Sequence, residues 1–418
     1  MHRRLACQPR PHCRCRCRPK EEDKRCTCPY NLVIHVRHGY VASRPGRCQR
    51  DETIVLVDDN FARGFLPIGP MPEVSCLHPI PTSSRDVTKT LDFFYYFTVP
   101  GVIIADDGVV SKATASEGGV VISSQPFTQS LPPLPEVGPS PAGTLDHPKF
   151  LALSRCAFPV EGRTDRETYF EMRASAFTRN TQLNPFGEPF VSDPYDDPRL
   201  AAAGLVTIEL ESNMVADVLY TNGGVYALYE RLENGRTADS NYASFTNVVK
   251  VATRDRFNPT EDVVTIGVGW SSAAIRWYVN RREVYRVDRI GFRPPDHRQT
   301  VIIDRGGEDR LVVPTKVNAG FGTFSLLDGF PANNYAGTFK PALVRLSSVP
   351  NIYRNPFRVD PVTGNYPPLE DDDFVDPENL PTSRIFNSSG TEPTQASQGA
   401  TLIVRNLLVA LRPVFKSL

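Results

Sequence analysis

The chain has 418 residues, 40% of them hydrophobic, which is enough to bury the core of one large domain or two ordinary ones. Lysine plus arginine and aspartate plus glutamate both number 47, and the zero net charge argues against a general attraction to nucleic acid or anionic membranes. Since no run approaches about 18 apolar residues and the charged first 30 residues resemble no secretory signal, we expect neither a transmembrane segment nor a signal peptide.

The first 51 residues form a predicted N-terminal arm that is rich in arginine and cysteine. Seven of the nine cysteines of the chain lie here: Cys7, Cys13, Cys15, Cys17, Cys26, Cys28 and Cys48. Most neighbours are one residue apart, whereas structural zinc sites usually use C-x2-4-C pairs. Three interpretations remain open: a zinc site, disulfide cross-links within or between chains, and a disordered arm whose arginines repel one another. Aromatic side chains for base stacking are missing before Tyr30, so nucleic-acid binding is not expected.

The rest of the chain predicts short strands joined by turns, because its 38 prolines and 28 glycines break helices. The segment 52–65 predicts a strand and then an acidic turn, and it is followed by a meander over 101–128 and a proline-rich connection over 130–144. Further strands are predicted at 168–177, 205–212, 214–222, 225–232, 242–252, 262–270 and 322–329. Only 197–204, with the sequence DPRLAAAG, looks helical. Residues 351–398 are interpreted as a proline-rich and acidic surface extension, and 399–418 as a final strand that returns to the sheet.

The stretch AAIRWYVNRREVYRV, residues 273–287, predicts a β-hairpin. Ile275, Trp277 and Val279 alternate with polar residues, which is the period of a half-buried strand, and a second strand follows at 284–287. Asn280 is suited to the left-handed conformation that a tight turn requires. The hairpin therefore places the tryptophan on the inner side of a sheet.

At least ten short strands and few helices favour an all-β fold, in which two antiparallel sheets bury their apolar faces against each other. The segment DVVTIGVGWSSAAIRWYVNRREVYRV resembles glycoside hydrolase family 16 and the wider concanavalin A-like lectin/glucanase superfamily, with Asn280-Arg281 in place of the usual Asp-Gly turn. Other segments, such as GTLDHPKFL and GTFSLLDG, resemble an uncharacterised family of these proteins. The resemblance implies a concanavalin A-like jelly-roll β-sandwich over residues 52–350, completed by the last strand.

The resemblance also implies where a catalytic strand would lie. Family 16 enzymes carry E-x-D-x-x-E or E-x-D-x-E on one strand, since retaining hydrolysis needs two carboxylates about 5 Å apart. The corresponding strand here, VYALYERL, supplies Glu230 alone on the face shared by Tyr226 and Leu228. Glu209 and Glu211 form another pair at spacing i, i+2, but their face, opposite Val, Ile and Leu, is typical of a solvated sheet surface.

His147, beside Asp146, is the second catalytic candidate. A histidine next to an acid can act as the base of a polysaccharide lyase, with arginine and tyrosine side chains steadying the uronate charge. His147 also precedes Pro148, and a structural role at a strand entry is favoured over catalysis. Acidic turns such as ADDG and EDDD offer oxygen ligands but lack the D-x-D-x-D-G order of a calcium loop, so no metal or cofactor is predicted.

A carbohydrate-interacting jelly roll, non-catalytic or atypical, is the leading functional hypothesis. Sugars stack on aromatic rings and hydrogen-bond to polar groups on the concave faces of such sandwiches. The candidate ligand-binding residues are Tyr226, Tyr229, Arg231, Arg236, Tyr242, Arg276 and Tyr278, and the expected partner is a polysaccharide or glycan. Two alternatives stay open: a virion or envelope component that self-associates through its cysteine arm, and a glycoside hydrolase or polysaccharide lyase.

Overall fold

The computed structural model describes residues 53–69, 76–95, 108–112, 119–124, 150–181, 193–232, 239–294, 307–324 and 399–414, together with the backbone of short strand segments elsewhere. The N-terminal arm, the extension at 351–398 and two candidates, His147 and Arg236, lie outside the described residues apart from isolated backbone strands. The only complete helical element within the described ranges is a short 3-10 turn, η2, at Ser84–Asp86. No described helix has the length and apolar character needed to cross a membrane.

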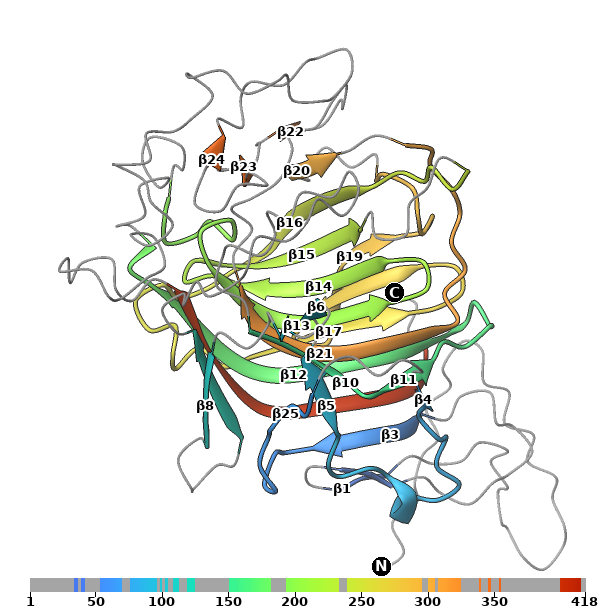
Figure 1. Cartoon of the computed structure of the whole chain (residues 1–418). Coiled ribbons are helices and arrows are strands. Elements are labelled where there is room, and N and C mark those ends of the chain that lie inside the picture. The colour runs from blue at the N-terminus through green and yellow to red at the C-terminus, as the bar shows by residue number, and fades with distance from the viewer. Residues whose placement is uncertain are drawn as a thin grey trace, which may run out of the picture.

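Two mostly antiparallel sheets form the body of the molecule (Figure 1). Sheet I has the strand order β22-β20-β16-β15-β14-β13-β21-β10-β5, with β11 beside β21 and β4 beside β11. Its bounds are β4 Cys76–Leu77, β5 Phe93–Tyr95, β10 Phe150–Ser154, β11 Cys156–Pro159, β13 Ala202–Glu209, β14 Met214–Tyr220, β15 Gly224–Arg231, β16 Phe245–Thr253, β20 Thr300–Asp304, β21 Lys316–Phe324 and β22 Thr338–Phe339.

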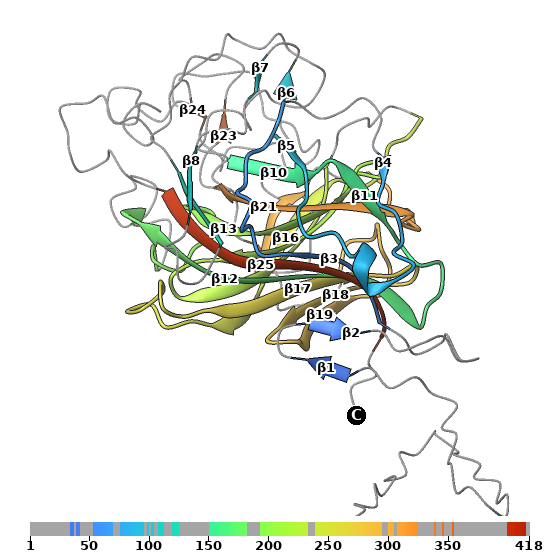
Figure 2. The same ribbon diagram turned by 90° about the horizontal axis from the view of Figure 1, so that it is seen from below.

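Sheet II has the order β19-β18-β17-β12-β25-β9-β8, with β3 also paired to β25. Its bounds are β3 Ile54–Asp59, β8 Gly108–Lys112, β9 Val120–Ser124, β12 Arg166–Arg179, β17 Val264–Trp270, β18 Ile275–Val279, β19 Arg282–Val287 and β25 Gly399–Pro413. Figure 2 shows β25, β3, β12 and β17 in one layer and β21 and β10 in the other. Short two-stranded pairs β1 Ile34–Val36 with β2 Gly39–Val41, β6 Thr98–Val99 with β7 Val102–Ile103, and β23 Arg345–Leu346 with β24 Tyr353–Arg354 complete the strands.

The chain crosses repeatedly between the sheets, from β12 to β13, from β16 to β17, from β19 to β20 and from β21 to β25. Side chains from both sheets fill the space between them in one apolar core, which includes Phe170, Leu205, Tyr229 and Trp277. The predicted all-β jelly-roll sandwich of two antiparallel sheets is therefore confirmed.

The hairpin at β18 and β19 has the predicted geometry. Trp277 is fully buried in the core, and Asn280 has the left-handed φ of 49° that its turn position requires. Arg281 is left-handed as well, with φ 65°, so both turn residues adopt the conformation of a two-residue hairpin turn.

The prediction of a helix over 197–204, DPRLAAAG, is wrong. Asp197 accepts a hydrogen bond from the Arg199 backbone N–H at 2.9 Å and closes a turn, after which the three alanines lead into β13. Gly204 shows why this stretch suits a strand: a Cβ there would lie 2.0 Å from the carbonyl oxygen of Val218 on β14. Close backbone approach in the sheet, rather than helix propensity, decides the conformation.

Candidate functional site

The outer face of sheet I, which points away from sheet II, is apolar and buried. Its members, here called the outer apolar cluster, are Phe94, Leu151, Leu153, Ala202, Val206, Ile208, Val215, Leu219, Tyr226, Leu228, Val248 and Phe324. Sheet I thus has apolar residues on both faces, unlike a sheet with one solvated side. The opposite face of β13 is buried as well. Thr207 and Glu209 on it are almost inaccessible, so the prediction of a solvated surface there is wrong.

Two carboxylates interrupt this apolar face. Glu230 shares the face with Tyr226 and Leu228, as predicted, and accepts a hydrogen bond from Thr246 Oγ1 on the neighbouring strand β16. Asp217 lies on the adjacent strand β14, where it pairs with Leu228, so it is a diagonal neighbour of Glu230. Burial raises the pKa of Asp217 well above its usual value, and the charge of Glu230 raises it further. The face therefore carries an acidic pair in an environment that favours the protonated form of Asp217.

Contacts through the sheet hold Asp217 in place. The pairing of β13 with β14 stops after Leu205↔Val218 and resumes at Ile208↔Val215. In this gap the Thr207 backbone N–H donates to Asp217 Oδ1 at 3.0 Å, and Trp277 Nε1 donates to the Asp217 carbonyl at 2.8 Å across the core. The tryptophan of the hairpin in sheet II thus fixes the backbone that carries the carboxylate in sheet I.

Further along the same face, polar groups gather around Asp196. Tyr226 donates its hydroxyl to Asp196 Oδ1 at 2.9 Å, and Lys250 on β16 forms an ion pair with the other carboxylate oxygen. Burial and the nearby Asp196 raise the pKa of the Tyr226 hydroxyl, so it stays protonated at physiological pH. Tyr226 is thus a hydrogen-bonded link between the apolar face and the loops at its end.

Those loops present two aromatic rings to solvent. The Phe257 side chain is 84% exposed and that of Tyr195 is 38% exposed. The Arg256 guanidinium lies 5.5 Å from the Tyr195 ring centroid and 5.8 Å from that of Phe257, and it forms an ion pair with Asp193 at 2.9 Å. We call these four residues, Asp193, Tyr195, Arg256 and Phe257, the aromatic cluster.

Local hydrogen bonds make the aromatic cluster rigid. Asp193 Oδ1 accepts the backbone N–H of Tyr195 at 3.1 Å, and Asp255 Oδ1 accepts that of Phe257 at 3.0 Å. Such side-chain-capped turns reduce the number of conformations that the loop visits. Phe257 is therefore exposed on a preorganised turn.

The remaining predicted ligand-binding residues do not share one surface. Tyr229 lies in the core between the sheets, and its hydroxyl accepts the backbone N–H of Gly291 at 2.7 Å, so it is not available to a ligand on an outer face. Arg231 lies under the ring of Tyr242, with 4.1 Å between the guanidinium carbon and the ring centroid. Arg276 and Tyr278 lie on the outer face of sheet II, the opposite side of the sandwich.

On the outer side of sheet II, Glu167 is fully buried and is surrounded by polar side chains of that sheet. Arg412 donates to Glu167 Oε1 at 2.8 Å, the Tyr278 hydroxyl donates to Glu167 at 2.9 Å, and Arg276 lies 3.7 Å from it. The Arg412 guanidinium also lies 3.3 Å from the ring centroid of Tyr169. These partners satisfy the buried carboxylate, which supports a structural role for the Arg276 and Tyr278 side chains.

Sequence reasoning missed Asp217 and the aromatic cluster. Asp217 is the single acid in the apolar strand MVADVLYTN, and an unpaired charge in such a run is the signal that points to it. Phe257 lies in the polar loop RDRFNPTED, where a lone aromatic residue is unexpected.

The fold and these residues define a two-sheet jelly-roll protein with an acidic pair and an exposed aromatic cluster. The chain belongs to a family of unknown function, DUF6081, whose model matches residues 85–413. It is 28% identical over 359 residues, 68% of this chain and 78% of the relative, to "Uncharacterized protein L829" of Acanthamoeba polyphaga mimivirus. The predicted membership of an uncharacterised family is thus confirmed.

Solved structures of carbohydrate-active proteins are also similar to this chain. The apo Crh5 transglycosylase matches with 12% identity over 73% of this chain and 85% of that one, at a TM-score of 0.27. The Bacillus licheniformis β-glucanase matches with 8% identity over 71% and 81%, also at 0.27. Alginate lyase A1-II′, of polysaccharide lyase family 7, matches with 7% identity over 72% and 84%, at 0.32. Similarity this low assigns neither an activity nor a substrate to this chain.

Proposed function

We propose that the protein binds a glycan through the aromatic cluster and the polar groups beside it. The observation that carries the proposal is the pair of exposed rings, Tyr195 and Phe257, on either side of Arg256. A sugar ring presents C–H groups that stack on an aromatic face, while its hydroxyls hydrogen-bond to charged side chains. Asp193 and Arg256 supply such charged groups beside the rings, and Lys250 is paired with Asp196, the residue that follows Tyr195.

The rigid turns favour binding because less conformational freedom is lost when a ligand docks. The proposal differs from the sequence-based expectation in location. The centre of the sheet I face is occupied by the outer apolar cluster, whose members are buried, so the accessible polar and aromatic groups lie at the end of that face.

Glycan-array screening followed by calorimetry with the best ligand tests this function. Phe257→Ala and Tyr195→Ala are each expected to weaken binding between about twofold and tenfold, the equivalent of roughly 0.5–1.5 kcal/mol per aromatic contact. Leu311→Ala is the matched control, because Leu311 is an exposed apolar side chain outside the cluster. Binding that is equally affected by all three variants, or unaffected by any, contradicts the proposal.

A glycoside hydrolase is the second candidate, and the Asp217–Glu230 pair is the observation that favours it. A carboxyl whose pKa is raised by burial, beside a second carboxylate, is an arrangement suited to acid–base hydrolysis of a glycosidic bond. Glu230→Gln should then abolish release of reducing ends from a polysaccharide panel. Glu209→Gln, which removes a buried carboxylate from the opposite face of sheet I, should leave that release intact.

A virion or other particle component that self-associates through the cysteine arm remains the third candidate. One support is the similarity to a mimivirus protein. The other is the odd number of remaining cysteines: Cys76 and Cys156 pair with each other, so the other seven of the nine cannot all pair within one chain. Purified particles should then contain the protein in quantity, and it should run as reducible multimers on a gel. A monomer on a non-reducing gel speaks against cross-linking.

A further inference from the structure

Arg231, at the end of β15, is a buried positive charge with no acidic partner among the described residues. Arg231 is only 7% exposed, yet none of the carboxylates in the described part of the chain forms an ion pair with it. Its Nη1 donates to the carbonyl of Arg310 at 3.3 Å, and the ring of Tyr242 covers the guanidinium. Its Nε has no hydrogen-bond partner within the described ranges.

The acids near Arg231 are engaged elsewhere. Asp309 pairs with Arg293 at 3.3 Å, and Glu308 pairs with Arg310 at 2.8 Å. Among these described residues, three arginines therefore face two carboxylates, which leaves one positive charge over. Because a buried charge without an opposite charge is destabilising, a protein that retains one often uses it to bind a ligand.

A second unpartnered polar side chain lies on the same inner face of sheet I. Asn247 on β16 is 2% exposed, and within the described part of the chain neither its amide nitrogen nor its amide oxygen has a hydrogen-bond partner. It pairs across the strands with Tyr229, which precedes Arg231 by two residues, so Asn247 and Arg231 are diagonal neighbours. Buried polar groups that lack partners mark places where a bound ion or small molecule completes the hydrogen bonding.

We propose that Arg231 and Asn247 bind a small oxyanion at this end of the sandwich. The shared chemistry is a carboxylate, sulfate or phosphate group, to which the guanidinium supplies charge and a free N–H, and the asparagine an amide N–H donor. Arg293 and Arg310 border the site, and because each is paired with a carboxylate, the uncompensated charge that would attract such a group is that of Arg231. The proposal is independent of the aromatic cluster, which lies in other loops.

Thermal unfolding of the full chain in sulfate, phosphate, acetate or chloride at matched ionic strength tests this site. We expect a saturable rise of the melting temperature with at least one oxyanion over chloride, and its loss in Arg231→Met. In chloride alone, Arg231→Met should be as stable as the parent or more so, because it removes an unpaired buried charge. A uronate or sulfated oligosaccharide, added in parallel, distinguishes a free ion from a group carried on a sugar.

Further variants separate the loss of a binding site from a general loss of stability. Asn247→Ala should weaken oxyanion binding at least fivefold, and this variant together with Arg231→Lys carries the test if Arg231→Met fails to fold. Arg163→Gln, which removes an exposed arginine from a loop in another part of the chain, should bind like the parent. The proposal is overturned if no oxyanion stabilises the parent beyond chloride, or if the stabilisation persists in Arg231→Met and Asn247→Ala.

Discussion

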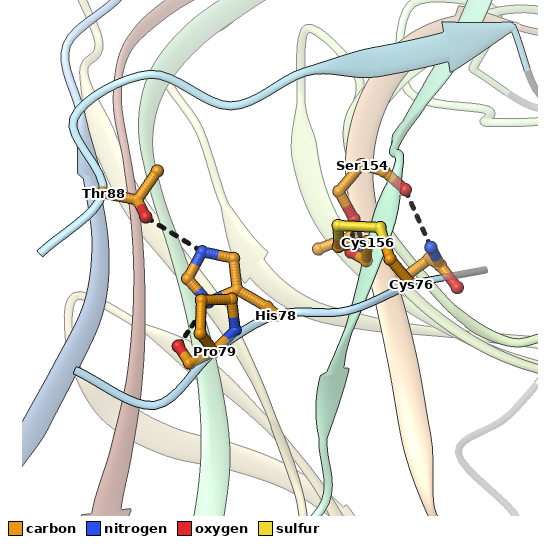
Figure 3. The surroundings of a disulfide bond; sticks show 8 residues. Cys76, His78, Pro79, Thr88, Ser154 and Cys156 are labelled. Atoms are coloured by element: carbon orange, nitrogen blue, oxygen red, sulfur yellow. Dashed lines mark hydrogen bonds between the residues drawn. A yellow bond between two sulfur atoms is a disulfide. The ribbon is translucent and has the colours of Figure 1, made fainter.

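The Cys76–Cys156 disulfide gives the most quantitative prediction about this fold. It joins β4 to β11 across a parallel pairing and closes a loop with a sequence separation of 80 residues (Figure 3). Next to it, His78 stacks on Phe158 and hydrogen-bonds to Thr88 Oγ1, which anchors the segment between β4 and η2. The bond therefore ties the segment that contains β4 to the edge of sheet I.

The size of the effect follows from the loop length. For a closed loop of this length, the loss of unfolded-state entropy corresponds to about 4.5 kcal/mol at 25 °C. A typical domain unfolds with a free energy of only about 5–15 kcal/mol. Cys76→Ala combined with Cys156→Ala should thus remove a large fraction of the stability.

Urea unfolding followed by tryptophan fluorescence measures this loss. Both tryptophans, Trp270 and Trp277, are fully buried between the sheets, so their emission reports the opening of the core. A reductant should destabilise the parent to the level of the double variant and leave the double variant unchanged. Equal stability of the parent and the double variant without reductant would refute the reasoning.

Three further changes test the packing around Asp217 and Glu167. Trp277→Phe leaves the Asp217 carbonyl without its 2.8 Å donor and should lower the free energy of unfolding by about 1–3 kcal/mol in urea; an unchanged value contradicts the cross-sheet contact. Gly269→Ala places a Cβ 2.2 Å from the Glu167 carboxylate and should cost about 1–3 kcal/mol, whereas Gly162→Ala, with open space around it, should cost much less. Because the folded pKa of Asp217 is raised above 3.8, its stabilising contribution is complete below that pH and is lost as the pH rises through the folded value. Asp217→Asn should remove this decline, so a profile that parallels the parent between pH 4 and 8 speaks against the buried acid.

The parts of the fold that the sequence predicted are strands with alternating apolar residues next to a recognisable turn sequence. Trp277 and Asn280 sit where alternation and turn chemistry place them, and Glu230 lies on the face that counting from Tyr226 indicates. The family resemblance rested on the same hairpin region. These features depend on local sequence, which a single chain displays directly.

The acidic pair was not predictable because it depends on strand register. Asp217 and Glu230 are neighbours only through the pairing of β14 with β15, and all seven residues of β14 are buried, so no polar alternation distinguishes its faces. The pairing of Cys76 with Cys156 likewise depends on the tertiary fold, since 80 residues separate the two in sequence. Long-range register and burial on both faces limit what periodicity can show.

The position of β25 has a consequence for how the protein is made. This strand lies inside sheet II, with β12 along one edge, over the whole of Arg166–Arg179, and with β9 and β3 along the other. A nascent chain that has not yet reached residue 399 therefore leaves β12 and β3 without the partner between them. A chain that ends before β25 thus presents the unpaired strand edges of β12, β9 and β3, which are the kind of edges that favour aggregation.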